Sequence, residues 1–273
     1  SSLKMLQMNK GKFSNVVVVG TGYNDLDDAN FARAVREITS EAKTQGVEVL
    51  WLTYRQAGNV RMKSVSYNRQ LFELEKKIDN FVDEFLIPTE KIWQPTDLLP
   101  NSEKDTFFDE LRDLREVAKD LPYDFWVVLV GDTITEEALP TYETWLMDVE
   151  GVNQKGENGD NGWAKWLRQW TGEENRHGDV LNKYLYLSGR VNMREVEMTT
   201  QHLINDGFDP GTGRDPYKNF VFTSFQELAT YISHNRVALL AKKFGDKKLH
   251  KMCNLIAGDE MRHHLAYSEF VKR

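Results

Sequence analysis

The sequence predicts a mainly α-helical protein, a bundle of long helices preceded by a small β-α-β segment. From about Tyr67 onward, apolar residues recur with helical spacing in stretches separated by polar, glycine- or proline-bearing breaks. Before that point, two apolar runs flank one stretch with helical spacing, which is the pattern of a strand, a helix and a strand. We therefore expect two parts, residues 1–66 and residues 67–273.

The composition is that of an ordinary globular protein. Of the 273 residues, 40% are hydrophobic and 28% are charged, and the formal net charge is −7. An acidic chain is a poor general binder of nucleic acid, because that binding depends on basic residues that displace counterions from phosphates. No apolar stretch approaches the roughly 20 residues that a membrane-spanning helix needs. From the acidic charge and the short apolar stretches we expect neither nucleic acid nor a membrane as a partner. The single cysteine, Cys253, excludes an internal disulfide.

The first part reads as strand, helix and strand. Residues 15–20 form a valine-rich run typical of a buried strand, residues 27–46 have helical spacing and end at a glycine, and residues 47–55 form a second apolar run. The text GTGYND that ends the first run is not a dinucleotide-binding fingerprint, because its sixth position is Asp25 rather than glycine.

The second part reads as a series of helices. Helical spacing begins in QLFELEKKIDNFVDEFLIP, which stops at Pro88. Further helices are expected at residues 103–119, 133–149, 163–188, 192–205, 217–244 and 246–272. The run FWVVLV, residues 125–130, fits a strand by propensity, and its assignment stays open.

Two of these helices carry the same motif, a glutamate followed three residues later by a histidine. The motif occurs in GEENRHGDV as Glu174 and His177, and in GDEMRHHLA as Glu260 and His263. On a helix this spacing places both side chains on one face about one turn apart, so that they can reach the same ion. Both pairs lie on apolar stripes, formed by Trp163, Trp166, Trp170, Leu181 and Tyr184 in the first helix and by Leu249, Met252, Ile256, Tyr267 and Phe270 in the second.

Further glutamates complete the pattern. Glu227 shares a stripe of a third helix with Phe220, Thr230, His234 and Val237. The helix expected over residues 133–149 offers Glu136 or Glu137, and spacing does not choose between them. Buried carboxylates are costly unless they are paired, protonated or bound to a cation. One glutamate from each of two helices and a Glu-x-x-His motif from each of two others is the arrangement of carboxylate-bridged di-iron bundles.

A single Glu-x-x-His motif is more often a surface ion pair, but the combination on separate apolar stripes favours a metal site. Carboxylate oxygens and imidazoles without thiolates suit iron or manganese better than zinc.

The helical part resembles the soluble acyl-[acyl-carrier-protein] desaturases, the stearoyl-type enzymes of plastids and their bacterial relatives. The resemblance runs from about Leu71 onward and rests on the stretches KIWQPTDLLP, VVLVGDTITEEALPTY, EENRHGDVLNKYLYLSGRVNM, FTSFQELATYISH and DEMRHH. It implies a ferritin-like di-iron four-helix bundle that holds two iron ions, and it favours Glu136 over Glu137. The six implied iron ligands are Glu136, Glu174, His177, Glu227, Glu260 and His263.

The resemblance also implies roles for three more residues. Thr230 matches the family's hydroxyl beside the oxygen-binding side of the metal pair, although by sequence alone it is a mid-helix threonine that bonds back to a carbonyl. Trp93 and Asp259 match, with His177, a route by which electrons pass from the surface to iron. By sequence alone, Trp93 is a packing residue and Asp259 is a partner that orients a ligating imidazole.

The implied reaction belongs to fatty acid biosynthesis. It removes two hydrogens from a saturated acyl chain on acyl carrier protein, using O2 and two electrons from reduced ferredoxin, and gives a cis double bond. The implied partners are acyl carrier protein, ferredoxin and a second copy of the chain as a homodimer. The basic stretch AKKFGDKKLHK is a candidate docking surface, and a solvated helix junction explains it equally well. Since no transit peptide is visible, we expect the bacterial cytoplasm, with the plastid stroma as the alternative.

Several features depart from the family's pattern. Met261 and His264 replace the lysine and glutamate of the usual DEKRHE, and Trp145 and Asp148 stand near positions that shape the substrate cavity. The family continues through further helices after the last ligand, so we expect the helical part to be C-terminally incomplete. Residues 1–66 resemble part of an SGNH/GDSL hydrolase, but they lack its Gly-Asp-Ser nucleophile block, so we expect no esterase activity.

Two alternatives come from other functional classes. A ferritin-like iron-oxidising or storage protein would assemble into a hollow shell with many irons per chain. An inactive interaction protein would retain the metal site but consume no O2.

Overall fold

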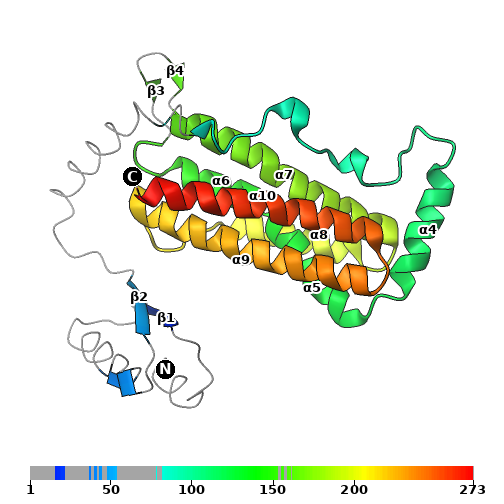
Figure 1. Cartoon of the computed structure of the whole chain (residues 1–273), viewed down its shortest axis with the longest axis horizontal. Coiled ribbons are helices and arrows are strands. Elements are labelled where there is room, and N and C mark those ends of the chain that lie inside the picture. The colour runs from blue at the N-terminus through cyan, green and yellow to red at the C-terminus, as the bar shows by residue number, and fades with distance from the viewer. Residues whose placement is uncertain are drawn as a thin grey trace. The chain divides into compact units, whose positions relative to one another are not determined.

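Figure 1 shows the chain as a computed structural model, which describes residues 16–21, 37, 40–41, 43–44, 48–53, 78, 82–152, 155–156, 159–160 and 162–272. The chain divides into two compact units, Ser1–Ser66 and Tyr67–Arg273. Each unit is described by itself.

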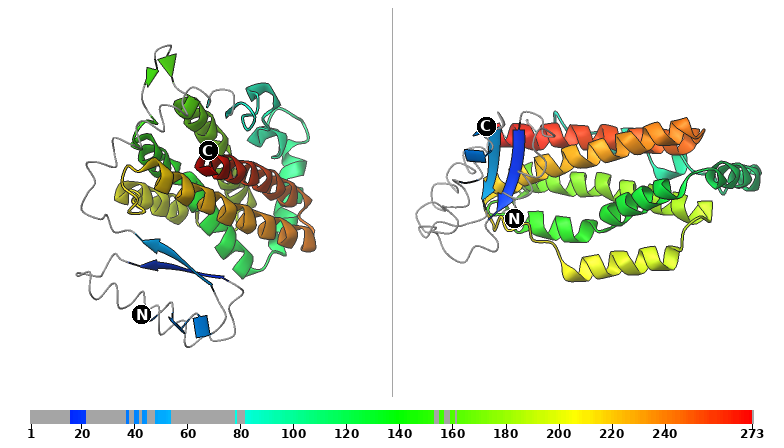
Figure 2. Two further views of the ribbon diagram at one scale, coloured as in Figure 1. Left: turned by 60° about the vertical axis from the view of Figure 1, so that its left-hand side comes forward. Right: turned by 90° about the horizontal axis from the view of Figure 1, so that it is seen from below.

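The first unit contains a parallel pair of strands, β1 (Val16–Thr21) and β2 (Glu48–Thr53), drawn in blue in Figure 2. The register runs from Val16 opposite Glu48 to Thr21 opposite Thr53. Parallel neighbours need a crossover connection, and the described residues between the strands are helical. Both strands coincide with the predicted apolar runs. Most of the helix predicted over residues 27–46, and GTGYND after Thr21, lie outside the described residues.

The second unit is mainly helical, as predicted. Its long helices are α7 (Gly162–Ser188), α9 (Pro216–Lys243) and α10 (Lys247–Lys272). The shorter helices are α4 (Phe107–Lys119), α5 (Tyr123–Glu137), α6 (Leu139–Met147) and α8 (Met193–Asp206). Two short 3-10 turns, η1 (Thr89–Lys91) and η2 (Pro95–Asp97), precede α4, and the strands β3 (Lys155–Gly156) and β4 (Gly159–Asp160) pair between α6 and α7.

The bundle is built from α5 with α6, α7, α9 and α10. The helices α9 and α10 lie side by side along their length, and α5 packs against α7 (Figures 1 and 2). The turn between α9 and α10 is short because Gly245 adopts a φ of 87°, a conformation that glycine reaches without steric cost. Asp246 then caps α10, since its Oδ1 accepts a hydrogen bond from the Leu249 amide at 2.8 Å.

The prediction of one helix over residues 133–149 is wrong, because the structure has two helices there and the first begins at Tyr123. Pro140 has no amide hydrogen to donate to the carbonyl of Glu136, which favours a kink or a break in the helix at this point. The proline instead sits in the first turn of α6, where no donor is required. Residues 125–130, whose assignment stayed open, lie in α5 with Phe125 and Leu129 buried.

The other predicted boundaries differ by a few residues at most. The helix predicted from residue 103 begins at Phe107. In the helix predicted before Pro88, Ile78 and Val82 are helical and buried, while the described residues from 83 onward form a turn. No helix within the described part of the chain is long and apolar enough to cross a membrane.

The apolar core consists of two clusters separated by a polar layer. One cluster contains Leu181 and Tyr184 of α7 with Met252 and Ile256 of α10. The other contains the predicted tryptophan stripe of α7 together with Tyr267 and Phe270 of α10. Both Glu-x-x-His motifs lie between the clusters along their own helices, so the polar layer is enclosed by apolar packing on both sides.

Candidate metal centre

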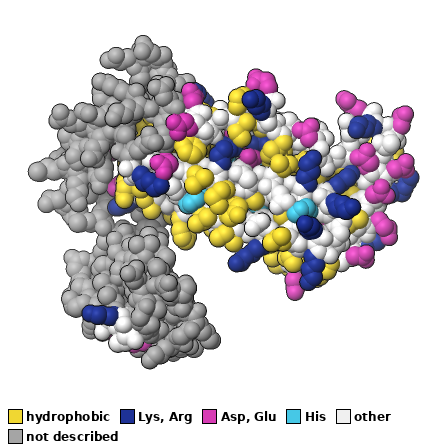
Figure 3. Space-filling view, viewed as in Figure 1, with side chains coloured by type: hydrophobic (Ala, Val, Ile, Leu, Met, Phe, Trp, Pro, Cys, Tyr) yellow, Lys and Arg dark blue, Asp and Glu magenta, His cyan; other side chains and the backbone are white. Residues whose placement is uncertain are grey.

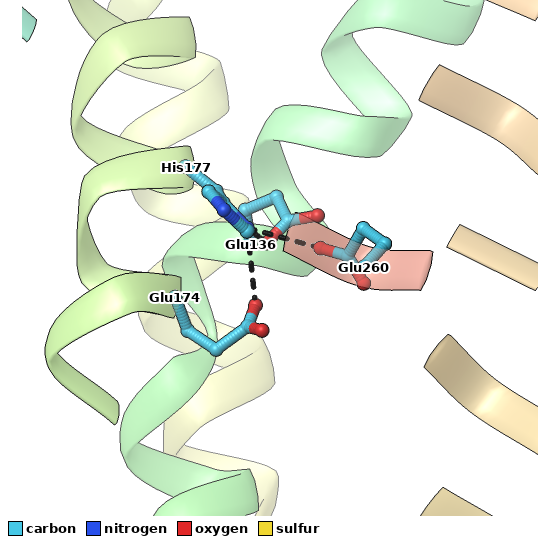
Figure 4. Close-up of side chains that lie close together, drawn as sticks. All are labelled: Glu136, Glu174, His177 and Glu260. Atoms are coloured by element: carbon cyan, nitrogen blue, oxygen red, sulfur yellow. Dashed lines mark ion pairs between the residues drawn. The ribbon is translucent and has the colours of Figure 1, made fainter. Parts of the chain in front are cut away.

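Six acidic and histidine side chains converge in the polar layer, and each is no more than 7% exposed. They form two groups whose potential ligand atoms all lie within 4.8 Å of one another. The first group is Glu136, Glu174, His177 and Glu260 (Figure 4), and the second is Glu174, Glu227, Glu260 and His263. Because Glu174 and Glu260 belong to both groups, the arrangement offers two neighbouring ion positions that share two carboxylates.

At the first position, the candidate histidine ligand atom is Nδ1 of His177. This atom lies 3.0 Å from Oε1 of Glu260 and 3.3 Å from Oε2 of Glu174. Dashed lines mark these ion pairs in Figure 4. Oε2 of Glu136 is 3.7 Å away. Glycine at position 178 lets α5 approach α7 here, since a Cβ would lie 3.2 Å from the backbone carbon of Glu136.

At the second position, the candidate histidine ligand atom is Nδ1 of His263. It lies 2.7 Å from Oε1 of Glu174 and 3.4 Å from Oε2 of Glu227. The two imidazoles are stacked with their ring centroids 6.2 Å apart. Glu174 therefore approaches His177 through Oε2 and His263 through Oε1.

The far nitrogen of each imidazole is held by an acid from the opposite motif. Nε2 of His177 lies 3.3 Å from Oδ2 of Asp259, and Nε2 of His263 lies 2.9 Å from Oε2 of Glu173. An acid in this place accepts a hydrogen bond from Nε2–H, so the lone pair of Nδ1 faces the shared carboxylates. Arg262 hydrogen-bonds both acids and thereby joins the two halves of the layer.

The sequence reasoning identified Asp259 in this outer layer but missed Glu173, Arg176 and Arg262. The sequence contains a pattern that could have identified these residues. EENRH and DEMRH each have an acid directly before the glutamate and an arginine directly before the histidine. In the fold, the two copies of this longer motif exchange their acids. Sequence spacing alone suggests that each acid serves its own helix.

Unsatisfied atoms provide a test of whether these residues fit a metal. Among the described residues, Nδ1 of His177 and of His263 and Oε1 of Glu174 and of Glu260 are buried atoms without a hydrogen-bond partner. Such atoms are costly unless a cation or proton lies between them. Four carboxylates would balance the charge of two divalent cations, and imidazole with carboxylate is a common donor set for transition metals. The residues fit a metal site.

Protons replace cations when no metal is bound. Burial and the neighbouring carboxylates of Glu174 and Glu260 raise the pKa of Glu227 well above its usual value. Burial alone would lower the pKa of His177 and His263, but the surrounding carboxylates outweigh it and raise both well above 6.5. The metal-free layer therefore keeps protons that a metal must displace.

We expect metal affinity to rise with pH. Because the pKa of each histidine is raised above 6.5 in the metal-free fold, protons compete with metal at neutral pH and are released on binding. Competition titration with a chelator, at about pH 6 and about pH 8, measures the change, and buffers of different ionisation enthalpy measure the released protons. An affinity that stays constant over this range would contradict the assignment.

Trp93 and Asp259 are in contact with each other beside His177. Nε1 of Trp93 donates to Oδ2 of Asp259 at 3.0 Å, and the same oxygen faces His177. The indole and imidazole rings are nearly parallel, with centroids 6.0 Å apart and an interplanar angle of 9°. Trp93 is half-buried and Arg176 covers its ring at 4.4 Å. The three side chains form a contiguous path from the surface to the first position.

Thr230 lies one turn after Glu227 on α9. Its hydroxyl donates to Oε2 of Glu260 and lies 3.0 Å from the backbone carbonyl of Glu227. The same hydroxyl therefore contacts both the polar layer and the preceding turn of its own helix.

A cavity of about 260 Å³ opens beside the polar layer. Its lining combines carboxylates of the two groups and Thr230 with aromatic, leucine and other polar side chains. Trp145 is part of this lining, whereas Asp148 is exposed and forms a salt bridge with Arg214 at 3.4 Å. The aromatic residues of the lining are Tyr142, Trp145, Trp170, Phe208 and Phe222.

The substitutions in the second motif lie outside both groups of candidate ligands. Nδ1 of His264 bonds the backbone carbonyl of Ser224 at 2.7 Å, which ties α10 to α9. Met261 is half-buried. Neither residue lines the cavity.

Known proteins are similar in sequence to this chain over most of its length. The family model described as fatty acid desaturase matches residues 68–273. Stearoyl-[acyl-carrier-protein] 9-desaturase 5, chloroplastic, of Arabidopsis thaliana is 49% identical over 248 residues, which cover 89% of this chain and 62% of that protein. Stearoyl-[acyl-carrier-protein] 9-desaturase, chloroplastic, of Ricinus communis is 52% identical over 208 residues, or 75% of this chain and 52% of that protein.

An acyl-[acyl-carrier-protein] desaturase, chloroplastic, of Cucumis sativus is likewise 52% identical over 75% of this chain. The chain spans about half the length of the curated relatives it matches. The Arabidopsis alignment covers more of the chain than residues 68–273, so it extends into the first unit. The match to the family model and the identities near one half lead to one conclusion: the chain belongs to the fatty acid desaturase family.

Proposed function

We propose that this chain carries the di-iron centre and substrate cavity of an acyl-acyl-carrier-protein desaturase. The reaction is the O2-dependent conversion of a saturated acyl chain on acyl carrier protein to a cis-monounsaturated one, with electrons from ferredoxin. The observation that carries the proposal is the pair of four-residue groups with two shared glutamates beside a largely aromatic cavity. The names of the relatives supply the acyl carrier and the type of reaction.

The proposed iron ligands are Glu136 and His177 at the first position, Glu227 and His263 at the second, and Glu174 and Glu260 between them. When bound, iron would supply the oxygen chemistry that amino-acid side chains lack, since they cannot remove hydrogen from an unactivated methylene. The chain's own contribution is to hold the acyl chain in the cavity and exclude water from it. Thr230 can hold a proton on its hydroxyl at Oε2 of Glu260, where the cavity meets the carboxylates.

Electrons are proposed to enter through Trp93, Asp259 and His177. Ferredoxin would dock over the half-buried Trp93, whose ring is covered by the buried Arg176. Acyl carrier protein is acidic. The lysines at the turn between α9 and α10 are candidates for its docking surface, although Lys248 also lies 3.4 Å from Glu110 of α4.

A homodimer is proposed to form over α9 and α10. Figure 3 shows hydrophobic side chains gathered on this face. Phe225, Ile232 and Leu239 are exposed at intervals of seven residues along α9, with Leu265 exposed on α10. A stripe of this kind is typical of a helix that packs against another surface. The chloroplast location in the relatives' names supports the plastid stroma over the bacterial cytoplasm as the site of action.

Trp145 is expected to limit the length of the acyl chain. Its ring packs against Phe208 and Phe222, with centroids 5.2 Å and 5.5 Å apart, and its indole nitrogen is buried without a hydrogen-bond partner. Trp145→Leu removes volume from the cavity wall without breaking a hydrogen bond. Each extra methylene then buried contributes about 0.8 kcal/mol, or roughly fourfold in kcat/KM for the longer substrate.

This change in chain-length preference is measured as the ratio of kcat/KM for two acyl chains that differ in length by about two carbons. Asp148→Asn is the matched control, because Asp148 lies on the same segment but is exposed. An unchanged ratio in Trp145→Leu would show that the tryptophan does not set the limit.

The proposed function is tested by loading the chain with Fe(II) without O2 and then supplying reduced ferredoxin, O2 and saturated acyl carriers of several lengths. A cis-unsaturated product and about two irons per chain are expected. A hollow assembly with many irons per chain would instead indicate iron storage. Iron binding with neither O2 consumption nor product would indicate an inactive metal-binding protein.

A further inference from the structure

Trp93, which is half-buried and stacks on His177, has a buried cation over its ring. The guanidinium carbon of Arg176 lies 4.4 Å from the centroid of the indole, and Arg176 is 6% exposed. One nitrogen of the guanidinium donates to the backbone carbonyl of Trp93 at 2.8 Å, and another donates to Oδ2 of Asp259 at 3.2 Å. These two hydrogen bonds fix the charge of Arg176 over the ring.

The other charged groups of this region are paired with one another. Oδ2 of Asp259 accepts a hydrogen bond from Nε1 of Trp93 at 3.0 Å, and the carboxylate also pairs with both Arg176 and Arg262. Arg262 pairs in addition with Glu173. The two acids thus balance the two arginines in total charge, but the charge that lies over the face of the indole is that of Arg176.

A cation over an indole has opposite effects on the two oxidation states of the ring. It is attracted to the neutral ring, whose face is negative. Loss of one electron makes the ring positive, so the attraction becomes a repulsion, and burial of Arg176 keeps water from screening it. Asp259 acts in the other direction, since it can take the Nε1 proton from an oxidised indole. The position of Arg176 therefore opposes an oxidation that Asp259 alone would favour.

We propose that Arg176 is a positioning residue whose charge, held over Trp93, protects this indole from one-electron oxidation. The inference rests on the proposed route of electrons through Trp93. Electrons from ferredoxin have to pass inward, whereas a centre oxidised by O2 can also draw an electron outward from the nearest oxidisable side chain. In that loss Trp93 gives one electron to the centre, which is reduced by one electron, and the Nε1 proton passes to Oδ2 of Asp259.

The cation makes this outward loss unfavourable without blocking the inward route. Electrons can tunnel across the neutral ring toward His177, and this transfer needs no oxidised indole. Arg176 thereby favours use of the oxidising power of the centre on the acyl chain rather than on the protein.

The test separates the charge of Arg176 from its covering of the ring. Arg176→Gln removes the charge and Arg176→Lys keeps it, and both remove the planar guanidinium. Arg190→Gln is the matched control, because Arg190 is exposed and its guanidinium carbon lies 5.9 Å from the centroid of Trp126. Each metal-free full chain receives an equal dose of photogenerated tris(bipyridine)ruthenium(III), a one-electron oxidant. Peptide mass spectrometry then measures the oxidation of each tryptophan.

Trp93 should be oxidised about 10-fold faster or more in Arg176→Gln than in the unmodified chain, because a desolvated cation–π contact corresponds to at least this factor. Arg176→Lys should restore most of the protection, and Arg190→Gln should leave the oxidation of Trp93 unchanged. Equal oxidation of Trp93 in Arg176→Gln and Arg176→Lys would show that covering rather than charge protects the ring, and would overturn the proposal. Unchanged oxidation in Arg176→Gln would also overturn it.

Circular dichroism shows whether each variant keeps its helices. If Arg176→Gln loses them, Arg176→Met takes its place, since methionine matches lysine in length and carries no charge. The same outcomes then decide the proposal.

The iron-loaded chain distinguishes this proposal from the proposed function. The chain is reduced and then given O2 without an acyl carrier, and electron paramagnetic resonance detects tryptophan radicals. Arg176→Gln should show a radical signal that disappears when Trp93→Phe is added to it. If this signal is missing although photo-oxidation shows the effect of the charge, the proposed electron route fails and the role of Arg176 stands.

Discussion

Replacing both Glu174 and Glu260 with alanine is expected to abolish binding of both metal ions. These are the two glutamates that belong to both ligand groups, and each lies within 3.3 Å of an imidazole nitrogen of the candidate site. Without them, each position retains one carboxylate and one imidazole, which is too few ligands for a transition metal. Iron per chain after anaerobic reconstitution should fall from about two to near zero.

The control for this experiment is the pair Glu195→Ala and Glu197→Ala, since both glutamates are exposed on α8. It has the same change of charge and should retain its iron. Far-ultraviolet circular dichroism of the metal-free variants shows whether the helices persist. If the Glu174, Glu260 variant keeps its helices and still binds two irons, the assigned ligands are wrong.

Replacing Asp259 with alanine is expected to have the largest effect on stability. Oδ2 of Asp259 accepts hydrogen bonds from Trp93 and Arg176 and faces His177. The side chains of Arg176 and Asp259 are only 7% and 9% exposed, so the change leaves a buried cation without its partner. Loss of one member of a buried ion pair costs about 3–5 kcal/mol in the free energy of unfolding. Metal affinity should also fall about 10- to 100-fold, because His177 loses the acid that orients it.

This prediction carries a pH dependence of known sign. Burial would raise the pKa of Asp259, but the hydrogen bond and charge of His177, with the charges of His263 and Arg262, lower it below its usual 3.8. The stabilisation is therefore present above that pH and is lost as the pH falls further. Urea unfolding of the metal-free proteins measures the free energy of unfolding of each variant. The control is Asp109→Ala, which breaks an exposed ion pair with Arg112 and should change that free energy by about 1 kcal/mol or less. Equal effects of the two substitutions would refute a buried role for Asp259.

The sequence predicted helices well where apolar periodicity was long and continuous. α7, α9 and α10 agree with their predicted ranges to within a residue or so, because each must bury one stripe along its whole length. The helix prediction was wrong between residues 123 and 147. The apolar residues of α5 lie almost all around the helix, so their spacing has no clear helical period. Pro140 marked the break, but only the packed fold required two helices there.

The sequence by itself determined which side chains can ligate a metal. The two Glu-x-x-His motifs and Glu227 were predicted from residue type and helical spacing, whereas only the family resemblance favoured Glu136 over Glu137. Tertiary structure decided which atom of each side chain faces which partner. The exchange of Asp259 and Glu173 between the motifs, and the contact of Arg176 with Trp93, join residues about 80 to 90 positions apart. Helical periodicity relates residues only along one helix, so contacts between helices follow from how the bundle packs.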